Sequence, residues 1–194
     1  QDCLFIALKG AHFNGNKFAH KAIESGARYA LVDDEAYVTC NQTILVSNTL
    51  ETLQQLANYH RRFLNIPVVA LTGSNGKTTT KELIAAVLSK KYNTIATNGN
   101  LNNHIGVPLT LLSMNKSTEI GVVEMGANHL KEIELLASIA EPNYGYITNF
   151  GKAHLEGFGG MQGVIKGKSE LYQFLGKTNG KAFVNPHDSL QLEK

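Results

Sequence analysis

Residues 68–80 read VVALTGSNGKTTT and place two glycines, a lysine and a run of threonines directly after an apolar segment. The backbone N–H groups of such a loop form a nest for anions, which the positive end of a following helix dipole strengthens. Lys77 can reach the β and γ phosphates of a nucleotide, and the Thr78 hydroxyl can bind magnesium. The pattern therefore predicts a triphosphate-binding loop made of Thr72, Gly73, Ser74, Asn75, Gly76, Lys77, Thr78 and Thr79.

The spacing of this loop differs from the common GxxxxGK[ST] pattern, because Leu71 stands at the first glycine position and the nearest glycine is Gly73. We therefore expect a tighter variant of the loop. Two glycines could also simply turn a strand into a helix, but that alternative does not explain the pair Lys77 and Thr78. The residues do not decide between ATP and GTP.

Glu124 ends an apolar run that begins at Gly121. If this run is a strand of a parallel sheet, its carboxyl end lies at the same edge as the phosphate loop, where ligands bind in such sheets. A carboxylate at that edge can hold magnesium directly or through water. The alternative is a solvated glutamate at a strand end.

Two further residues carry weaker signals. His154 lies in the loop 149–154 after another apolar run, and therefore at the same predicted edge, although a lone histidine is often a packing or capping residue. Lys168 lies in a predicted helix, Met161 to Leu175. Most helical lysines are solvated, and the residue pattern alone gives no reason to expect otherwise for Lys168.

Residues 97–104, TNGNLNNH, carry four asparagines in one predicted loop. Asparagine adopts left-handed backbone and caps helices, and Pro108 then suits the first turn of a helix. Such a role explains one or two of the four. Beside a nucleotide site, the others favour hydrogen bonding to a polar substrate.

The elements that must position these residues alternate between strands and helices from Val68 onward. This alternation predicts an α/β fold with a mostly parallel sheet and helices on both faces. The preceding residues predict a small mixed α/β domain with short strands, a turn at residues 13–16 and a helix ended by Gly26. The predicted strands of the larger part are Val68 to Thr72, Thr94 to Ala96, Gly121 to Glu124, Gly145 to Thr148 and Ala182 to Val184, and its helices are Lys77 to Lys90, Pro108 to Ser113, His129 to Ala140 and Met161 to Leu175.

Length and composition fit a globular protein of one or two domains. Asn48 and Glu51 form a capping box that begins a helix, and Pro67 marks its far limit, so we place domains at residues 1–66 and 67–194.

The 194 residues carry a net charge of +2 without a long basic run, which argues against nucleic acid or an anionic membrane as partner. No signal peptide or membrane-spanning stretch is evident, so we expect a cytoplasmic protein, and Cys3 and Cys40 are expected to be reduced thiols. Because the chain does not begin with methionine, we expect it to be a fragment.

Five segments of the chain resemble the Mur ligases, the ATP-dependent amide-forming enzymes of peptidoglycan precursor synthesis. They are TGSNGKTTTKE, TNGNLNNHIGVPLTLL, VVEMGANHLKEIE, TNFGKAHLEGFG and IKGKSELY. The amino-terminal DCLFIALKGAHFNGNKF is similar to the family's small uridine-nucleotide-binding domain, with Asn14 and Asn16 where aspartate and histidine are usual. Within the family, the pattern is most similar to members that add D-Ala-D-Ala to UDP-MurNAc-tripeptide.

The resemblance implies a role for each candidate residue. Lys77 would hold the ATP phosphates, Thr78 and Glu124 would bind a first Mg²⁺, and His154 would help to bind a second. Lys168 matches the lysine that the family carbamylates, which converts an ammonium into a carboxylate-like magnesium ligand and replaces the solvated role expected from the helix alone. The loop that faces the nucleotide-sugar substrate is matched by Asn100, Asn102 and Asn103.

The implied reaction activates a carboxylate. The terminal carboxylate of UDP-MurNAc-tripeptide attacks the γ-phosphate of ATP to give an acyl phosphate and ADP, and the amine of D-Ala-D-Ala then displaces phosphate.

The family has a third domain that closes over ATP, and it would follow Lys194. The chain alone, expected to be a monomer, is therefore predicted to bind nucleotide or UDP-substrate weakly and to show no turnover. Two alternatives stay open: a Mur-type ligase that adds a single amino acid, and a P-loop module in which ATP hydrolysis drives conformational change.

Overall fold

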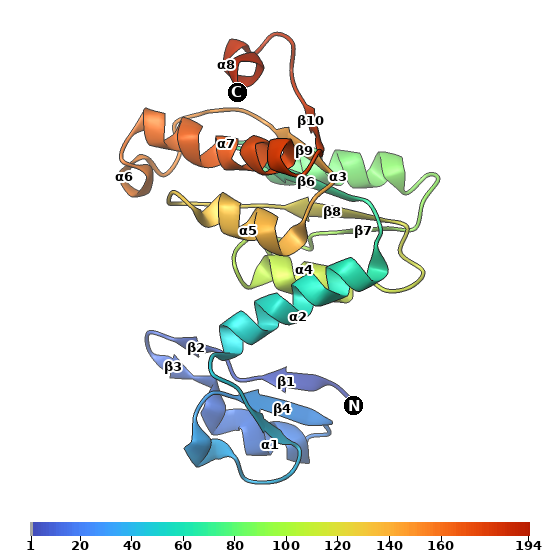
Figure 1. Cartoon of the computed structure of the whole chain (residues 1–194), viewed down its shortest axis with the longest axis vertical. Helices are drawn as coiled ribbons and strands as arrows, with labels where there is room; N and C mark the ends of the chain where they lie inside the picture. Colours follow the sequence, from blue (N-terminus) through green and yellow to red (C-terminus); the bar gives the residue numbers. More distant parts are fainter. Residues whose placement is uncertain (1) are drawn as a thin grey trace. The chain divides into compact units, whose positions relative to one another are not determined.

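The computed structural model describes residues 2–194 and divides the chain into two compact units (Figure 1). The first ends at Leu56 and the second comprises Ala57–Lys194, so the chain passes from one to the other within helix α2 (Thr49–Leu64). Asn48 caps this helix as predicted, because its Oδ1 accepts hydrogen bonds from the N–H groups of Leu50 and Glu51 at 2.9 and 3.1 Å. The domain limits 1–66 and 67–194 stay a prediction.

The smaller unit has the mixed α/β architecture that the sequence predicts. Three parallel strands form its sheet, in the order β1 (Leu4–Ile6), β4 (Tyr29–Val32) and β5 (Thr43–Leu45). The predicted turn at residues 13–16 is wrong in part: β3 (Phe13–Asn14) pairs with β2 (Lys9–Gly10) in a hairpin that turns at residues 11–12. A 3₁₀ helix then begins at Gly15, and the Asn14 side chain caps it by accepting from Asn16 N–H. The remaining elements are the 3₁₀ helices η1 (Gly15–Phe18) and η2 (Glu35–Tyr37) and the helix α1 (Ala19–Glu24).

A buried polar network holds the hairpin of this unit to its sheet. Asn16 is 1% exposed, and its Nδ2 donates to Asp33 Oδ1 at 2.8 Å and to Asn14 Oδ1 at 3.0 Å. Lys9 Nζ lies 2.7 Å from the same Asp33 oxygen. Burial alone would raise the pKa of the Asp33 carboxyl, but the hydrogen bonds from Lys9 and Asn16 outweigh it and lower that pKa. The two asparagines therefore have structural partners within the unit.

The larger unit is a five-stranded parallel sheet, as the alternation of elements predicts. Leu71 on the central strand pairs with Glu124 on one side and with Tyr146 on the other, so the carboxyl ends of these three strands meet at one edge. The order across the sheet is β10 (Lys181–Phe183), β9 (Tyr144–Ile147), β6 (Val68–Thr72), β8 (Ile120–Glu124) and β7 (Thr94–Ala96).

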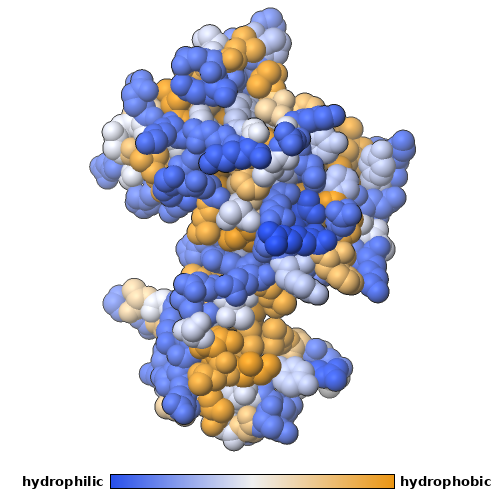
Figure 2. Space-filling view, in the orientation of Figure 1, coloured by the Kyte–Doolittle hydropathy of each residue, from blue (hydrophilic) through white to orange (hydrophobic). Residues whose placement is uncertain are grey.

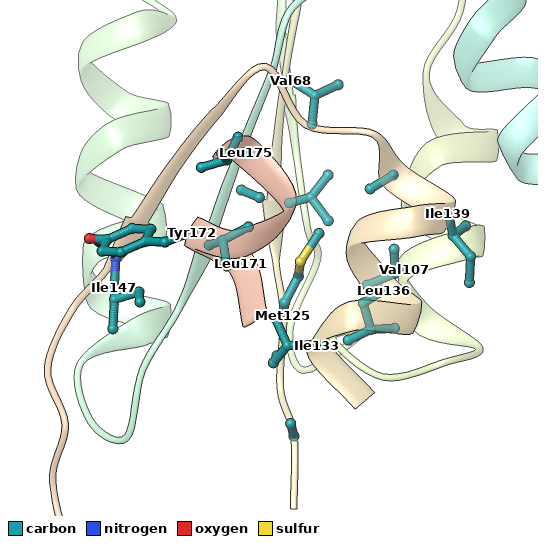
Figure 3. Close-up of a cluster of buried hydrophobic side chains, with 14 of the residues drawn as sticks. Val68, Val107, Met125, Ile133, Leu136, Ile139, Ile147, Leu171, Tyr172 and Leu175 are labelled. Atoms are coloured by element: carbon teal, nitrogen blue, oxygen red, sulfur yellow. Dashed lines mark hydrogen bonds between the residues drawn. The ribbon is translucent and has the colours of Figure 1, made fainter. Parts of the chain in front are cut away.

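Helices lie on both faces of this sheet, again as predicted. On one face, α4 (Gly106–Ser113), α5 (Glu132–Ala140) and α7 (Met161–Lys177) pack over the main hydrophobic core (Figure 3). Val68 and Ala70 belong to that core, whereas Val69 faces α3 (Lys77–Leu88) on the opposite face, because successive side chains of a strand alternate. Two short helices were not predicted, since four or five residues are too few for a helical period to show. They are α6 (Leu155–Phe158) and α8 (Ser189–Glu193).

Two helices begin at residues other than those predicted, and hydrogen bonds to side chains explain both. Helix α5 begins at Glu132 rather than at His129, because the Glu132 carboxylate accepts from the N–H groups of Asn128 and His129 and holds a turn there. Helix α4 begins at Gly106, two residues before Pro108. Its N–H donates to Asn103 Oδ1 at 2.9 Å, so this asparagine caps the helix.

The face of the sheet that carries α3 is only partly covered. Beside α3, an apolar groove of about 480 Å³ is lined by Val69, Tyr146 and Phe183 together with α3 residues. Leu83 and Val87 of α3 are 63% and 72% exposed. Hydrophobic residues also gather over the sheet of the smaller unit (Figure 2). None of the helices within residues 2–194 combines the length and the apolar character that a membrane crossing requires.

We predict that Leu111→Ala lowers the free energy of unfolding by about 2–5 kcal/mol, because the side chain is fully buried in the core and its removal leaves a cavity. Leu109→Ala on the same helix, where the side chain is 42% exposed, serves as the control and should change stability by less than about 1 kcal/mol. Chemical denaturation followed by circular dichroism measures both. Equal effects of the two changes would contradict the assigned core.

Candidate functional site

The loop between β6 and α3 has the backbone shape that its glycines allow. Gly73 has φ of +143°, and a Cβ placed on it would lie 2.0 Å from Thr148 Oγ1. Gly76 has φ of +75° directly before α3, with open space around it. Gly73 is therefore required for close approach to the segment after β9, whereas Gly76 is required for the backbone conformation alone.

Residues 148–151, directly after β9, hold this loop in place. Asn149 accepts from Ser74 N–H through its carbonyl oxygen at 3.1 Å and from Asn75 N–H through its side chain at 3.2 Å. Thr148 Oγ1 donates to Asn75 O at 2.6 Å. The N–H groups of Ser74 and Asn75 are thus engaged within the protein. The N–H groups of the first turn of α3 have no intrahelical partner, as at every helix start, and point along the helix axis toward the site.

Lys77 lies against its own loop. Its Nζ donates to Gly73 O at 2.9 Å and to Ser74 O at 3.4 Å. Burial lowers the pKa of Lys77, and the carboxylate of Glu124 acts in the opposite direction. The ammonium is therefore held at the loop, with a negative partner on the neighbouring strand.

Glu124 is buried, so the solvated glutamate considered from the sequence is excluded. Its side chain is 1% exposed, and its Oε1 accepts from Asn102 Nδ2 at 2.7 Å. Its Oε2 is buried and has no hydrogen-bond partner. Buried polar atoms are almost always paired, and an unpaired carboxylate oxygen is costly to bury. An oxygen of this kind suits a divalent cation such as Mg²⁺.

The asparagine-rich loop, residues 97–104, forms one wall of a pocket of about 500 Å³. Asn102 binds Glu124 through its side chain, and its carbonyl oxygen accepts from Gly126 N–H at 2.7 Å. Asn103 caps α4, which is the turn role considered from the sequence. The pocket brings together five sequence-predicted site residues: Lys77, Asn100, Asn102, Asn103 and His154. Residues not predicted also line it, namely His104, Gly126, Ala127, Asn128, Glu132, Leu135 and Leu136.

Lys168 is buried rather than solvated, which corrects the expectation drawn from the helix alone. It is 1% exposed, its Nζ donates to Ala127 O at 3.1 Å, and the ammonium lies 5.2 Å from the centre of the Phe158 ring. Burial and the nearby charge of Lys77 lower the pKa of Lys168 to about 8, against the opposing carboxylates of Glu132 and Glu170. Roughly one quarter of this amine is therefore neutral at about pH 7.5.

Several residues that shape the site were missed by the sequence reasoning. Glu170 accepts from the N–H groups of Lys131 and Glu134, at 2.7 and 3.0 Å, and so caps α5 beside the pocket. Lys81 is fully buried and donates to Thr97 O at 2.6 Å. Its spacing of four residues from Lys77 puts both on one side of a helix, which is the signal that could have found it.

The structure does not assemble a metal site from histidine, cysteine and carboxylate side chains alone. Within residues 2–194, no three such side chains lie together in a suitable arrangement. A cation at Glu124 would therefore need oxygen ligands of other kinds, such as the Thr78 hydroxyl, nucleotide phosphate or water. The predicted metal ligands Thr78, Glu124, His154 and Lys168 stay a prediction.

Comparison with known proteins identifies relatives of both units. Residues 1–70 match the model of the Mur ligase family catalytic domain, and residues 71–193 match that of the Mur ligase middle domain. A UDP-N-acetylmuramoyl-tripeptide–D-alanyl-D-alanine ligase of Bacillus subtilis is 42% identical over 193 residues, which cover 98% of this chain and 42% of the relative.

Solved structures give the same result. MurF from Acinetobacter baumannii superposes with a TM-score of 0.89 at 38% identity, covering 98% of this chain and 42% of that one. MurF from Thermotoga maritima in complex with ADP superposes with a TM-score of 0.81 at 36% identity, covering 88% and 40%. The chain thus spans about two fifths of the length of these relatives.

The contrast between the two loop glycines gives a testable difference. We predict that Gly73→Ala destabilises the larger unit by more than Gly76→Ala, because only the first adds a clash to the strain of a positive φ. At Gly76, whose backbone is left-handed helical, the strain alone costs about 1–2 kcal/mol. When Thr148→Ala is combined with each glycine change, it should recover part of the stability lost in Gly73→Ala and none of that lost in Gly76→Ala. Denaturant melts of the two single glycine variants and the two double variants measure this. Equal losses at the two glycines would contradict the packing of the loop on residues 148–151.

Proposed function

Because the chain belongs to the Mur ligase family, we propose that it is part of an ATP-dependent ligase that joins D-Ala-D-Ala to UDP-MurNAc-tripeptide in peptidoglycan precursor synthesis. The observation that carries this proposal is Glu124: a buried carboxylate with one unpaired oxygen, beside the phosphate loop and bonded to the asparagine-rich loop. The named activity of relatives at about 40% identity supports the choice of substrates. ADP in the Thermotoga maritima structure supports ATP as the nucleotide.

The proposed reaction begins when the terminal carboxylate of the tripeptide attacks the γ-phosphate of ATP, forming an acyl phosphate and releasing ADP. The amine of D-Ala-D-Ala then attacks the acyl carbon, and inorganic phosphate leaves. The first-turn N–H groups of α3 and the Lys77 ammonium bind and orient the phosphates, so the ammonium exchanges loop carbonyls for phosphate oxygens. Charge dispersal and positioning supply most of the rate in such transfers.

Glu124 fits a role in holding Mg²⁺, with Thr78 as its partner. When bound, the metal neutralises charge on the phosphoryl group in transfer. The protein's own contribution is to fix the carboxylate: Asn102 holds Oε1, which leaves Oε2 as the ligand atom. His154, which lines the pocket, and Lys168 in its carbamylated form are proposed for a second metal.

The lowered pKa and the burial of Lys168 support its carbamylation. The neutral amine attacks CO₂, forms a C–N bond and loses a proton, which leaves a carbamate anion. At about pH 7.5, an amine with a pKa of about 8 is roughly one quarter neutral, whereas an ordinary lysine is about 0.1% neutral. Burial and the hydrogen bond from Nζ to Ala127 O keep the amine in one place.

Two other functions are the alternatives to test. A Mur-type ligase that adds a single amino acid would use the same phosphate loop and the same metal residues. Phosphate release by the full-length protein, with each candidate amine in turn, decides between them: the proposal expects release with D-Ala-D-Ala and not with single amino acids. A P-loop module without peptide substrate would hydrolyse ATP without either substrate. We also propose that the protein is cytoplasmic and monomeric.

We predict that Glu124→Gln abolishes most of the gain in ADP affinity that Mg²⁺ gives, by at least about tenfold, because the amide keeps the bond from Asn102 but loses the charge. Affinity without metal should stay unchanged. Glu119→Gln, at the residue directly before the same strand, is the control. Calorimetric titration of the chain with ADP, with and without Mg²⁺, measures the effect, and an unchanged Mg²⁺ dependence in Glu124→Gln would sink the metal assignment.

We predict a carbamate signal when the chain is mixed with ¹³C-labelled CO₂ and examined by ¹³C nuclear magnetic resonance. At constant dissolved CO₂, the signal should rise as pH increases through about 8, because the neutral fraction of Lys168 rises there. Lys168→Met should remove it, and Lys166→Met, at an exposed position of the same helix, should not. A signal that survives Lys168→Met would disprove carbamylation at this residue.

A further inference from the structure

Lys81 is a buried cation that the proposed reaction does not use. Its side chain is 0% exposed, and its Nζ donates to Thr97 O at 2.6 Å and lies 2.8 Å from Glu82 Oε1. Lysine is among the residues least often fully buried, because its ammonium and flexible stem both lose by burial. An apolar side chain of similar length would fill the same space without that cost. The ammonium therefore serves a particular partner, and the buried one is the carbonyl of Thr97.

Thr97 is fixed by three hydrogen bonds at the point where β7 ends and the asparagine-rich loop begins. Its carbonyl oxygen accepts from Lys81, and its N–H donates to Val122 O at 2.9 Å on the neighbouring strand. Its Oγ1 accepts from the N–H of Glu124 at 2.9 Å. Thr97 thus connects helix α3 to strand β8, including the backbone of Glu124 at the end of that strand.

A second contact closes the connection at the carboxylate itself. Five residues after Thr97, Asn102 donates to Glu124 Oε1, and its carbonyl oxygen accepts from Gly126 N–H. Glu124 is therefore held through its backbone by the start of the loop and through its side chain by the end of the loop. Lys77 and Lys81 lie one turn apart on α3, so the helix that begins at the phosphate loop also anchors the loop that orients Glu124.

We propose that Lys81 is a positioning residue, which sets Glu124 and the asparagine-rich loop relative to the phosphate loop through its hydrogen bond to Thr97 O. Lys81 itself touches neither nucleotide nor metal in this role. Loss of its ammonium leaves a buried carbonyl without a donor, and such a group draws in water or shifts until it finds a partner. The loop would then move at its origin, and the carboxylate would lose its fixed orientation.

The first test needs no ligand and therefore does not depend on the proposed function. In Lys81→Met, amide hydrogen exchange should become about tenfold faster at Glu124 and Gly126, whose N–H groups bond to Thr97 and Asn102. The amide of Gly121, which bonds to Pro67 O, should keep its wild-type rate. Glu82→Gln is the control, because it removes the negative charge of the exposed partner of Lys81 and leaves the buried bond. Uniform acceleration across the sheet, or none at all, would overturn the proposal.

The second test rests on the proposed function, since it uses ADP and Mg²⁺ as probes. Lys81→Met should weaken ADP binding in the presence of Mg²⁺ by about tenfold, and leave binding without metal within about twofold of wild type. A role in overall stability would reduce both affinities by the same factor. Wild-type Mg²⁺ dependence in Lys81→Met would overturn the inference, whereas a wild-type chain that does not bind ADP would count against the proposed function and leave the exchange result to decide this one.

Lys81→Arg keeps the experiment decisive if Lys81→Met does not fold. Arginine retains the charge and donors but changes their reach, so it should preserve the fold while disturbing Thr97 O. The same pattern is then required: faster exchange at Glu124 and Gly126, with Gly121 unchanged. Wild-type exchange at all three amides, or a general increase, would contradict a positioning role.

Discussion

The burial of the Glu124 carboxylate is the constraint on which the site depends. A carboxylate without full hydrogen bonding costs several kcal/mol in a protein interior, so the surrounding structure must supply partners or a cation. Asn102 provides one partner, and the ammonium of Lys77 provides an opposite charge nearby. Among the described residues, Oε2 of Glu124 has no hydrogen-bond partner, and this is why we propose it as a metal ligand beside the proposed phosphate loop. The burial of Glu124 therefore accounts both for its structural partners and for its proposed role as a metal ligand.

The parallel sheet brings the other residues of the site to the same edge as Glu124. Its register brings the ends of β6, β8 and β9 together, and residues 148–151, which follow β9, fix the phosphate loop that follows β6. Thr97 and Asn102, in the loop that follows β7, fix Glu124 at the end of β8. Lys168 reaches the same region from α7 and contacts Ala127 O on the pocket wall. Each charged group thus has its own fixed hydrogen-bond partner: carbonyls of the phosphate loop for Lys77, the Asn102 side chain for Glu124 and the Ala127 carbonyl for Lys168.

Local patterns in the sequence predicted the elements well, and tertiary contacts explain what they missed. The strands Val68–Thr72 and Thr94–Ala96 have their predicted limits, because short apolar runs and flanking turn residues are local signals. The burial of Lys168 and Lys81 is not local: both depend on carbonyl partners, Ala127 and Thr97, distant in sequence. Composition cannot distinguish such lysines from solvated ones. The family resemblance found the first, and only the structure found the second.

A crystal structure with Mg²⁺ and a non-hydrolysable ATP analogue tests the central claim most directly. The account predicts the triphosphate over the first turn of α3, with Mg²⁺ about 2.1 Å from Glu124 Oε2 and bound also by the Thr78 hydroxyl. Triphosphate at this loop with the metal held by other residues, and Glu124 Oε2 still unpaired, would contradict it.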